Sequence, residues 1–167
     1  KNHSFLIEIF KEYLALDPTA ILVLIGIGEL EPKIRNLVNR SEIQSNVIFL
    51  GQRNDVRELY NTFDVFLLPS LYEGLPVVGI EAQANGLPCL FSDTISDEVV
   101  ILPGTKVLKL SDSAQIWADT IRELVNKKTI DRAKAIDVIN AAGYNIEVEA
   151  EKLRKYYFAE VTERKRK

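Results

Sequence analysis

Two glutamates eight positions apart, Glu73 and Glu81, are the first candidates for chemistry, because a carboxylate can exchange protons or accept hydrogen bonds from hydroxyl groups. Glu73 lies in a turn-forming stretch, whereas Glu81 lies within an apolar helical pattern, where an unpaired charge is costly to bury. Helical spacing puts Glu81 on the same face as Val77 and Val78, which predicts that it points inward. The two hydroxyls of a ribose would be suitable partners. An internal hydrogen bond, or a partly exposed position at the helix edge, accounts for Glu81 equally well.

The residues after Glu73 predict an anion-binding turn. Gly74 permits backbone angles that other residues avoid, and Pro76 suits the first turn of a helix. The amides of Gly74, Leu75 and Val77 would then lie near a helix N-terminus, where the helix dipole favours negative charge. A pyrophosphate would fit there.

Glycines also end two of the apolar runs. Gly26 and Gly28 form a G-x-G after the first run, and Gly51 follows the second. A tight turn is the commoner explanation of a lone G-x-G, and the third glycine of the dinucleotide-binding fingerprint is absent. These glycines are therefore weak candidates for ligand contact by themselves.

Short apolar runs alternate with longer helical patterns along the chain, as in βα units on a parallel sheet. The expected strands are Ile21–Ile27, Asn46–Leu50, Asp64–Leu68, Pro88–Ser92 and Val107–Leu110. The expected helices are Ser4–Leu16, Glu31–Arg40, Val56–Thr62, Val77–Asn85, Ala114–Lys127, Ile130–Ala142 and Ile146–Glu160. We therefore predict the α/β class, with residues 1–167 as one domain that ends in helices over about 130–160.

Proline and glycine bound the helix that carries Glu81. Pro76 can start it, and Gly86 followed by Pro88 is typical of a helix end. This helix follows the strand Asp64–Leu68, so its N-terminus should lie at the carboxyl edge of the sheet, where open α/β folds bind ligands.

Composition excludes several classes of function. The net charge of −3 gives no general attraction to nucleic acid, so none is expected as a partner. Cys89 is the only cysteine, which excludes an intrachain disulfide and a cysteine-rich zinc site. With His3 as the only histidine, Cys89 is better explained as a packed core residue than as a nucleophile.

No apolar run is long enough to cross a membrane, and no signal peptide opens the chain, so a cytoplasmic protein is expected. The basic run Arg164 to Lys167 is expected to be solvated. Its alternative is contact with the inner face of the cell membrane.

The stretch "PSLYEGLPVVGIEAQANGLPCLFSD" resembles the hallmark region of retaining GT-B glycosyltransferases, the glycosyl transferases group 1 type. Their Glu-x7-Glu motif is filled here by Glu73 and Glu81. "KNHSFLIEIF", "LVLIGIGEL" and "VIFLGQRNDVRELYNTFDVFLLPS" resemble other segments of the same domain, in the same order. The resemblance implies a Rossmann-like parallel sheet flanked by helices, the C-terminal, donor-binding half of a GT-B fold.

The resemblance also implies roles for particular residues. Glu81 would bind the ribose of a nucleoside-diphosphate sugar, and Glu73 would be the catalytic carboxylate that contacts the donor sugar. Gly74 and Leu75 would approach the phosphates or the sugar. The remaining donor-binding positions would be Gly26, Gly28 near the diphosphate or the acceptor, and Gly51 and Arg53 at the base. Arg53 would stack on the base or would simply be a surface arginine.

Lys1 matches the lysine that neutralises the diphosphate in this family. Its usual arginine partner would precede residue 1, so donor affinity is expected to be lower. The implied reaction is transfer of a hexosyl group with retention, without a metal or another cofactor, and UDP-sugars are favoured over GDP-sugars as donors. Bacterial surface-polysaccharide synthesis is the implied setting, by analogy alone.

Two parts of the family's fold have no counterpart in the sequence. The acceptor-binding N-terminal domain, the expected partner of this one, is absent, so these residues alone are expected to be inactive. In strand order 3-2-1-4-5-6 the first strand is absent too, which would leave a central gap. Rearrangement, self-association or marginal stability is expected to follow. The C-terminal helix would expose Leu153, Tyr156 and Tyr157.

Two rival functions remain open. A non-catalytic, regulatory nucleotide-binding module would keep Glu81 but would not need Glu73. A Rossmann-like domain that only binds other proteins would need neither carboxylate.

Overall fold

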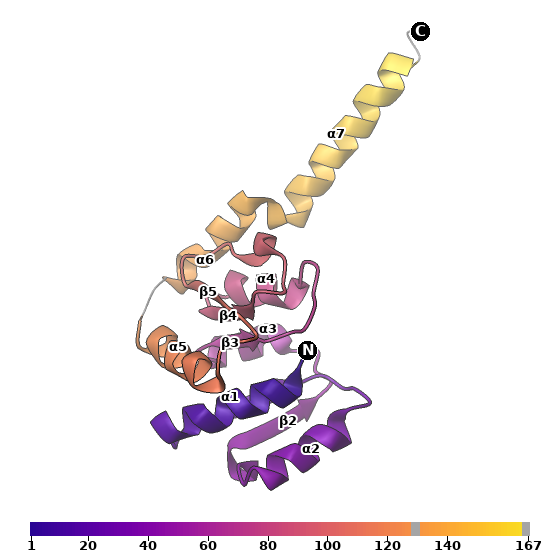
Figure 1. The fold of residues 1–167 in the computed structure, drawn as a ribbon. Helices are drawn as coiled ribbons and strands as arrows, with labels where there is room; N and C mark the ends of the chain where they lie inside the picture. Colours follow the sequence, from indigo (N-terminus) through magenta and orange to yellow (C-terminus); the bar gives the residue numbers. More distant parts are fainter. Residues whose placement is uncertain (128–130, 165–167) are drawn as a thin grey trace.

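The computed structural model describes residues 1–127 and 131–164, in which helices alternate with short parallel strands (Figure 1). The strands are β1 (Leu22–Ile25), β2 (Val47–Gly51), β3 (Phe66–Leu68), β4 (Cys89–Ser92) and β5 (Thr105–Leu108). The helices are α1 (His3–Leu16), α2 (Glu31–Arg40), α3 (Val56–Leu59), α4 (Val77–Ala84), α5 (Ala114–Asn126), α6 (Arg132–Ile139) and α7 (Ile146–Arg164). The predicted α/β class is confirmed.

The strands form two parallel sheets instead of the single sheet expected from the alternation. β1 pairs with β2, and β4 pairs with β3 on one edge and β5 on the other. Within residues 1–127 and 131–164 no strand joins β1 to β3. A cavity of about 1060 Å³ lies between them, lined by residues 21–25 on one side and 65–68 on the other. This gap lies where the sequence predicted that a central strand is absent.

Helices cover both faces of the larger sheet, so its middle strand is buried throughout. Leu90 of β4 packs in one cluster with Ile9 of α1 and Trp117 of α5. Its neighbours Cys89 and Phe91 point to the opposite face and pack with residues of α4 and α6. Because a strand covered on both faces needs apolar residues on both, β4 reads as a continuous apolar run.

Glycines let α4 lie close to its neighbours. A Cβ on Gly79 would come within 3.0 Å of the Phe91 ring and of the Val99 side chain. Gly86, just after α4, has a positive φ of 70°, and a Cβ there would lie 2.8 Å from the Cα of Arg132 in α6. The glycine therefore both ends α4 and leaves room for α6.

Several predicted boundaries are wrong in detail; the strand predicted at Asp64–Leu68, for example, is β3 at Phe66–Leu68. The strand predicted at Val107–Leu110 is β5 at Thr105–Leu108, because the amides that follow it bond to the side chains of Asp112 and Asp93. The helix predicted over 56–62 is α3 followed by a 3-10 turn, Tyr60–Thr62. β1 ends at Ile25, since Gly26 turns away with a φ of 120°. Of the predicted helix 130–142, residue 130 lies outside the described residues.

α7 projects away from the rest of the molecule (Figure 1). A π-turn, Asn140–Tyr144, links it to α6 and contains Gly143 with a φ of 93°. Leu153, Tyr156 and Tyr157 are exposed on it, as predicted. The basic residues 165–167 lie outside the described part of the chain. In residues 1–127 and 131–164, no helix combines the length and the apolarity needed to cross a membrane.

Candidate functional site

Five of the nine predicted site residues line the cavity between β1 and β3. They come from four parts of the chain and are Lys1, Gly26, Gly28, Arg53 and Glu81. The Gly26 amide also donates to the carbonyl of Gly51 at 2.8 Å, which ties the G-x-G turn to the end of β2. This grouping lies where β1 and β2 end, at the carboxyl edge predicted for the ligand.

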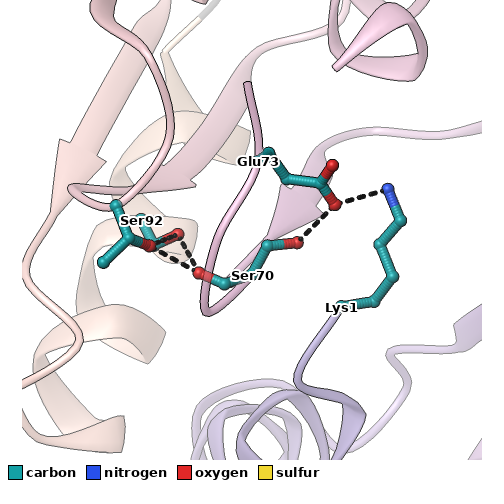
Figure 2. A network of polar contacts seen from close by, with 5 residues as sticks. Lys1, Ser70, Glu73 and Ser92 are labelled. Carbon is teal, nitrogen blue, oxygen red and sulfur yellow. Dashed lines mark hydrogen bonds and ion pairs between the residues drawn. The ribbon is translucent and has the colours of Figure 1, made fainter. Parts of the chain in front are cut away.

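Glu73 is held at the same edge by a polar network (Figure 2). The Lys1 ammonium lies 2.7 Å from the Glu73 carboxylate, and the Ser70 hydroxyl donates to that carboxylate at 3.2 Å. Ser70 is itself fully buried, and its carbonyl accepts from the hydroxyls of Ser92 and Thr94, each at 2.6 Å. The Glu73 loop is thereby fastened to the ends of both β3 and β4.

The Lys1 ammonium lowers the pKa of Glu73, and the Ser70 hydrogen bond adds to this, against the opposing effect of partial burial. Because the folded-state pKa lies below its ordinary value, the interaction stabilises the fold at neutral pH and is lost as the pH falls through that lowered pKa. Glu73 is therefore an anion at physiological pH.

Replacing Lys1 with methionine should raise the pKa of Glu73 toward its ordinary value, because the ion pair is its main cause. NMR titration of the Glu73 carboxyl carbon over the acidic range measures this. Lys11→Met, on exposed α1 surface, is the matched control and should leave the titration unchanged. An unshifted Glu73 titration in Lys1→Met would show that the ion pair does not form in solution.

The prediction that Glu81 points inward is wrong. α4 buries Gly79, Ile80, Ala82 and Gln83, whereas Glu81 is exposed. Gly79 faces the sheet, where a Cβ would come within 3.0 Å of the Phe91 ring. Glu81 instead lines the cavity, so its charge stays hydrated and available to a ligand. The costly burial that first drew attention to Glu81 does not occur.

Tyr60, which carries no signal in the sequence, lies next to Glu81. Its ring is 4% exposed and packs edge-on against Phe63 and Phe66. Its hydroxyl donates to the Val78 carbonyl at 3.3 Å, and Tyr60 is one of the residues that line the same cavity. Burial, and then the charge of Glu81, raise the pKa of Tyr60 to about 12. The phenol is therefore a fixed, neutral donor beside the carboxylate.

Arg53 lies at the cavity wall but is paired within its own loop. Its guanidinium donates to both carboxylate oxygens of Asp55, at 2.8 and 2.5 Å. Both side chains are about half exposed, so this is a surface pair that a ligand can displace at small cost.

Gly74 and Leu75 continue the Glu73 loop without lining the cavity. The Gly74 carbonyl accepts from the Ser96 amide at 3.4 Å, and Leu75 is exposed. The loop then enters α4 through Pro76, which sits at the N-cap position. In the described residues no group of three or more histidine, cysteine, aspartate or glutamate side chains is arranged to hold a metal ion.

Several supporting residues were missed by the sequence analysis. Ser70 lies just after an apolar strand and Ser92 is the last residue of another, which is a signal for the carboxyl edge of a sheet that could have found them. Thr94 and Tyr60 carry no such signal, because their partners are distant in the sequence.

Curated relatives of the chain are glycosyltransferases. A putative glycosyltransferase of Bacillus subtilis, EpsF, is 44% identical over 122 residues, which cover 72% of this chain and 32% of EpsF. An Escherichia coli UDP-Gal:alpha-D-GlcNAc-diphosphoundecaprenol alpha-1,3-galactosyltransferase is 39% identical over 79 residues, 47% of this chain and 20% of that protein. The chain thus spans a third or less of these relatives.

Solved structures share its fold at lower identity. TarM superposes with a TM-score of 0.79 at 23% identity, covering 93% of this chain and 32% of TarM. HepE of Anabaena, solved in complex with UDP, superposes with a TM-score of 0.77 at 17% identity, covering 95% of this chain and 45% of HepE. The fold is thus that of GT-B glycosyltransferases. The family model "Glycosyl transferases group 1" matches residues 1–142, and the chain belongs to this family.

Proposed function

We propose that residues 1–167 are the donor-binding domain of a retaining glycosyltransferase that takes a hexosyl group from a UDP-sugar. One observation carries the proposal: Lys1, the Gly26 turn and Glu81 line one cavity, and Lys1 also holds Glu73. A cation, a glycine turn and two carboxylates at one sheet edge suit the phosphates and hydroxyls of a nucleotide sugar.

Each part of the donor has a proposed partner. Glu81 accepts from the ribose hydroxyls, with the Tyr60 hydroxyl beside it. Lys1 and the amides after Glu73 hold the diphosphate, without a resident metal. Glu73 contacts the hexose, and Gly28 lies near the diphosphate. The base lies against the end of β2, where Gly51 and Arg53 meet the cavity.

The chemistry assigned to this half is charge stabilisation. As the bond between the anomeric carbon and the diphosphate oxygen breaks, negative charge grows on the leaving group and positive charge grows on the sugar ring. Lys1 is placed to stabilise the first, and Glu73 to stabilise the second. When the diphosphate forms an ion pair with Lys1, Glu73 loses its own ion pair with Lys1, and its carboxylate can then contact the sugar. Donor binding therefore prepares the catalytic carboxylate.

The choice of UDP and of surface polysaccharide rests on the similar proteins. HepE was solved with UDP, and the E. coli relative is named for a UDP-Gal donor and a diphosphoundecaprenol-linked acceptor. A lipid-linked acceptor would bring the whole enzyme to the inner face of the cell membrane from the cytoplasm, which we include in the proposal.

We propose that the acceptor-binding N-terminal domain of the whole enzyme covers exposed apolar side chains at the carboxyl edge of the sheets. Large apolar side chains of the loops at the carboxyl edge are exposed, including Ile27, Leu30, Leu71 and Tyr72, the last at 83%. Exposed apolar groups gathered around polar site residues are typical of a surface that another domain covers. Transfer is therefore assigned to the two halves together.

Calorimetry with UDP, GDP, ADP and their hexose conjugates tests this function. We expect UDP to bind and UDP-hexose to bind more tightly, with the sugar-dependent gain lost in Glu73→Ala. Glu8→Ala removes an exposed carboxylate of α1 outside the cavity and should change neither affinity. Equal affinity for UDP and UDP-hexose would indicate a nucleotide-binding module. The absence of any binding would indicate a domain that only binds other proteins.

Removing the hydroxyl of Tyr60 should weaken UDP binding by about threefold, because its hydrogen bond to the Val78 carbonyl of α4, worth roughly 0.5–1 kcal/mol, helps to hold the helix that carries Glu81. Tyr60→Phe keeps the ring and its packing on Phe63 and Phe66, so the thermal midpoint should change little. Calorimetry and thermal unfolding of the same preparations measure the two effects. A large fall in the midpoint with unchanged UDP affinity would show that the hydroxyl is only structural.

A further inference from the structure

The Ser70 side chain is a buried hydrogen-bond donor directed at Glu73 (Figure 2). Ser70 is 0% exposed, and its hydroxyl donates to the Glu73 carboxylate at 3.2 Å. A buried hydroxyl that loses its acceptor cannot bond to bulk water instead, so the loss is costly. This cost keeps the Glu73 carboxylate where it can accept from Ser70.

Two further hydroxyls fix the backbone of Ser70. Ser92, at the end of β4, and Thr94, in the turn that follows, each donate to the Ser70 carbonyl at 2.6 Å. A carbonyl oxygen has two lone pairs, so these two hydrogen bonds use its full capacity. The two hydroxyl oxygens lie 3.0 Å from each other. The orientation of Ser70 therefore depends on Ser92 and Thr94.

The turn that carries Thr94 is held on both sides. Before Thr94, the Asp93 amide donates to the Leu108 carbonyl of β5 at 2.9 Å. After Thr94, Ile95 forms a parallel bridge with Glu73. The Thr94 side chain is exposed overall, so the core does not need it for packing. Its hydroxyl is thus a donor placed in advance by backbone contacts.

We propose that the hydroxyls of Ser92 and Thr94 position the Glu73 carboxylate toward the donor hexose. They act through Ser70, so they are positioning residues. This inference rests on the proposed function, in which the diphosphate forms an ion pair with Lys1. In the described residues two side chains contact the Glu73 carboxylate, those of Lys1 and Ser70, so the Ser70 contact is the one that remains. Its direction then decides which sugar hydroxyls the carboxylate can reach.

The pKa of Glu73 distinguishes positioning from packing. The Lys1 ammonium is the largest cause of its lowering, and the Ser70 hydrogen bond adds to it. Because a donated hydrogen bond stabilises the charged carboxylate, its loss raises the pKa. If Ser92 and Thr94 served only to pack the loop, removal of their hydroxyls would leave the pKa of Glu73 unchanged.

Calorimetry of the full chain with UDP, UDP-glucose and UDP-galactose tests the proposal. The measured quantity is the sugar-dependent gain, defined as the dissociation constant of UDP divided by that of the more tightly bound conjugate. Thr94→Val keeps the shape of the side chain without its hydroxyl, and we expect it to lower the gain by about threefold. Ser70→Ala should abolish most of the gain. The affinity for UDP itself should change by less than about twofold in both variants.

Two matched variants are the controls. Thr94→Ser keeps the hydroxyl and should keep the gain of the native chain. Thr120→Val removes a hydroxyl of α5 that donates to the Ile116 carbonyl at 2.9 Å, outside the cavity. It should change neither affinity.

NMR titration of the Glu73 carboxyl carbon tests the same contact without a ligand. In a Lys1→Met background the ammonium no longer dominates the pKa of Glu73. Addition of Ser70→Ala should then raise this pKa, and addition of Thr94→Val should raise it less. Addition of Thr94→Ser should leave it unchanged.

Three outcomes contradict the positioning role. A sugar-dependent gain that survives both Thr94→Val and Ser70→Ala would show that Glu73 does not need these hydroxyls. An equal loss of affinity for UDP and its conjugate would show that the whole site is disturbed. A pKa of Glu73 that no added substitution raises would show that Ser70 does not hold the carboxylate. A native chain without any gain would instead contradict the proposed function, and the titration would then decide alone whether Ser70 holds Glu73.

Discussion

The variant Glu81→Ala is expected to bind UDP about 10- to 100-fold more weakly than the native chain. Two ribose hydroxyls donating to one carboxylate contribute roughly 1.5–3 kcal/mol, and each 1.4 kcal/mol is a factor of ten in affinity. Glu81 is exposed on α4 and outside the core, so its removal should leave the free energy of unfolding within about 0.5 kcal/mol of the native value. Calorimetry and urea unfolding measure the two quantities.

A double-mutant cycle assigns the loss to the ribose. Dideoxy-UDP, which lacks both ribose hydroxyls, should bind the native chain with the weak affinity that UDP has for Glu81→Ala. The same analogue should bind both chains equally, because the interaction is already gone. Glu8→Ala is the matched control and should bind both ligands as the native chain does. If Glu81→Ala weakens UDP and dideoxy-UDP by the same factor, Glu81 does not bind the ribose.

The order of elements could be predicted because local signals determine it. Apolar runs mark the strands, and the helix predicted between Pro76 and Gly86, Val77–Asn85, ends one residue beyond α4. The division into two sheets carries no local signal, since it depends on which strand lies between β1 and β3. Only the strand order of a known fold pointed to it.

The direction of Glu81 could not be predicted, because α4 is apolar on almost every side. Val77, Val78 and Ile80 offer two competing faces in a helix of eight residues. Packing decides between them: Gly79 allows the close approach to Phe91, so the face with Gly79 is buried and Glu81 faces the cavity. The assignment of Glu81 to a ligand was therefore reached from a wrong premise about its burial.

Polar contacts between residues distant in the sequence also could not be predicted. The hydroxyl of Ser92 bonds to a carbonyl 22 residues earlier, and Tyr60 reaches a carbonyl 18 residues later. Serine and tyrosine are common in loops, and nothing in their spacing marks these partners. Such contacts depend on the fold and cannot be predicted from the sequence before the fold is known.

Gln83 is expected to be the residue of α4 on which stability depends most. It is fully buried, and its amide nitrogen donates to the carbonyls of Gly79 and Val99. Its amide oxygen accepts from the amides of Ile101 and Leu102 and from the Thr105 hydroxyl. This one side chain satisfies backbone hydrogen-bonding groups of the loop between β4 and β5.

Gln83→Met should therefore lower the free energy of unfolding by about 3–5 kcal/mol. Methionine keeps the volume but leaves three donors without a partner, each at a cost of roughly 1–3 kcal/mol when buried. Urea unfolding, with the midpoint and the slope fitted separately, measures the loss. The same change at Gln115, an exposed position of α5 that bonds only to Asp119, should cost less than about 0.5 kcal/mol. A loss below 1 kcal/mol in Gln83→Met would mean that the loop finds other partners, such as water, and that α4 does not depend on Gln83 for its place against β5.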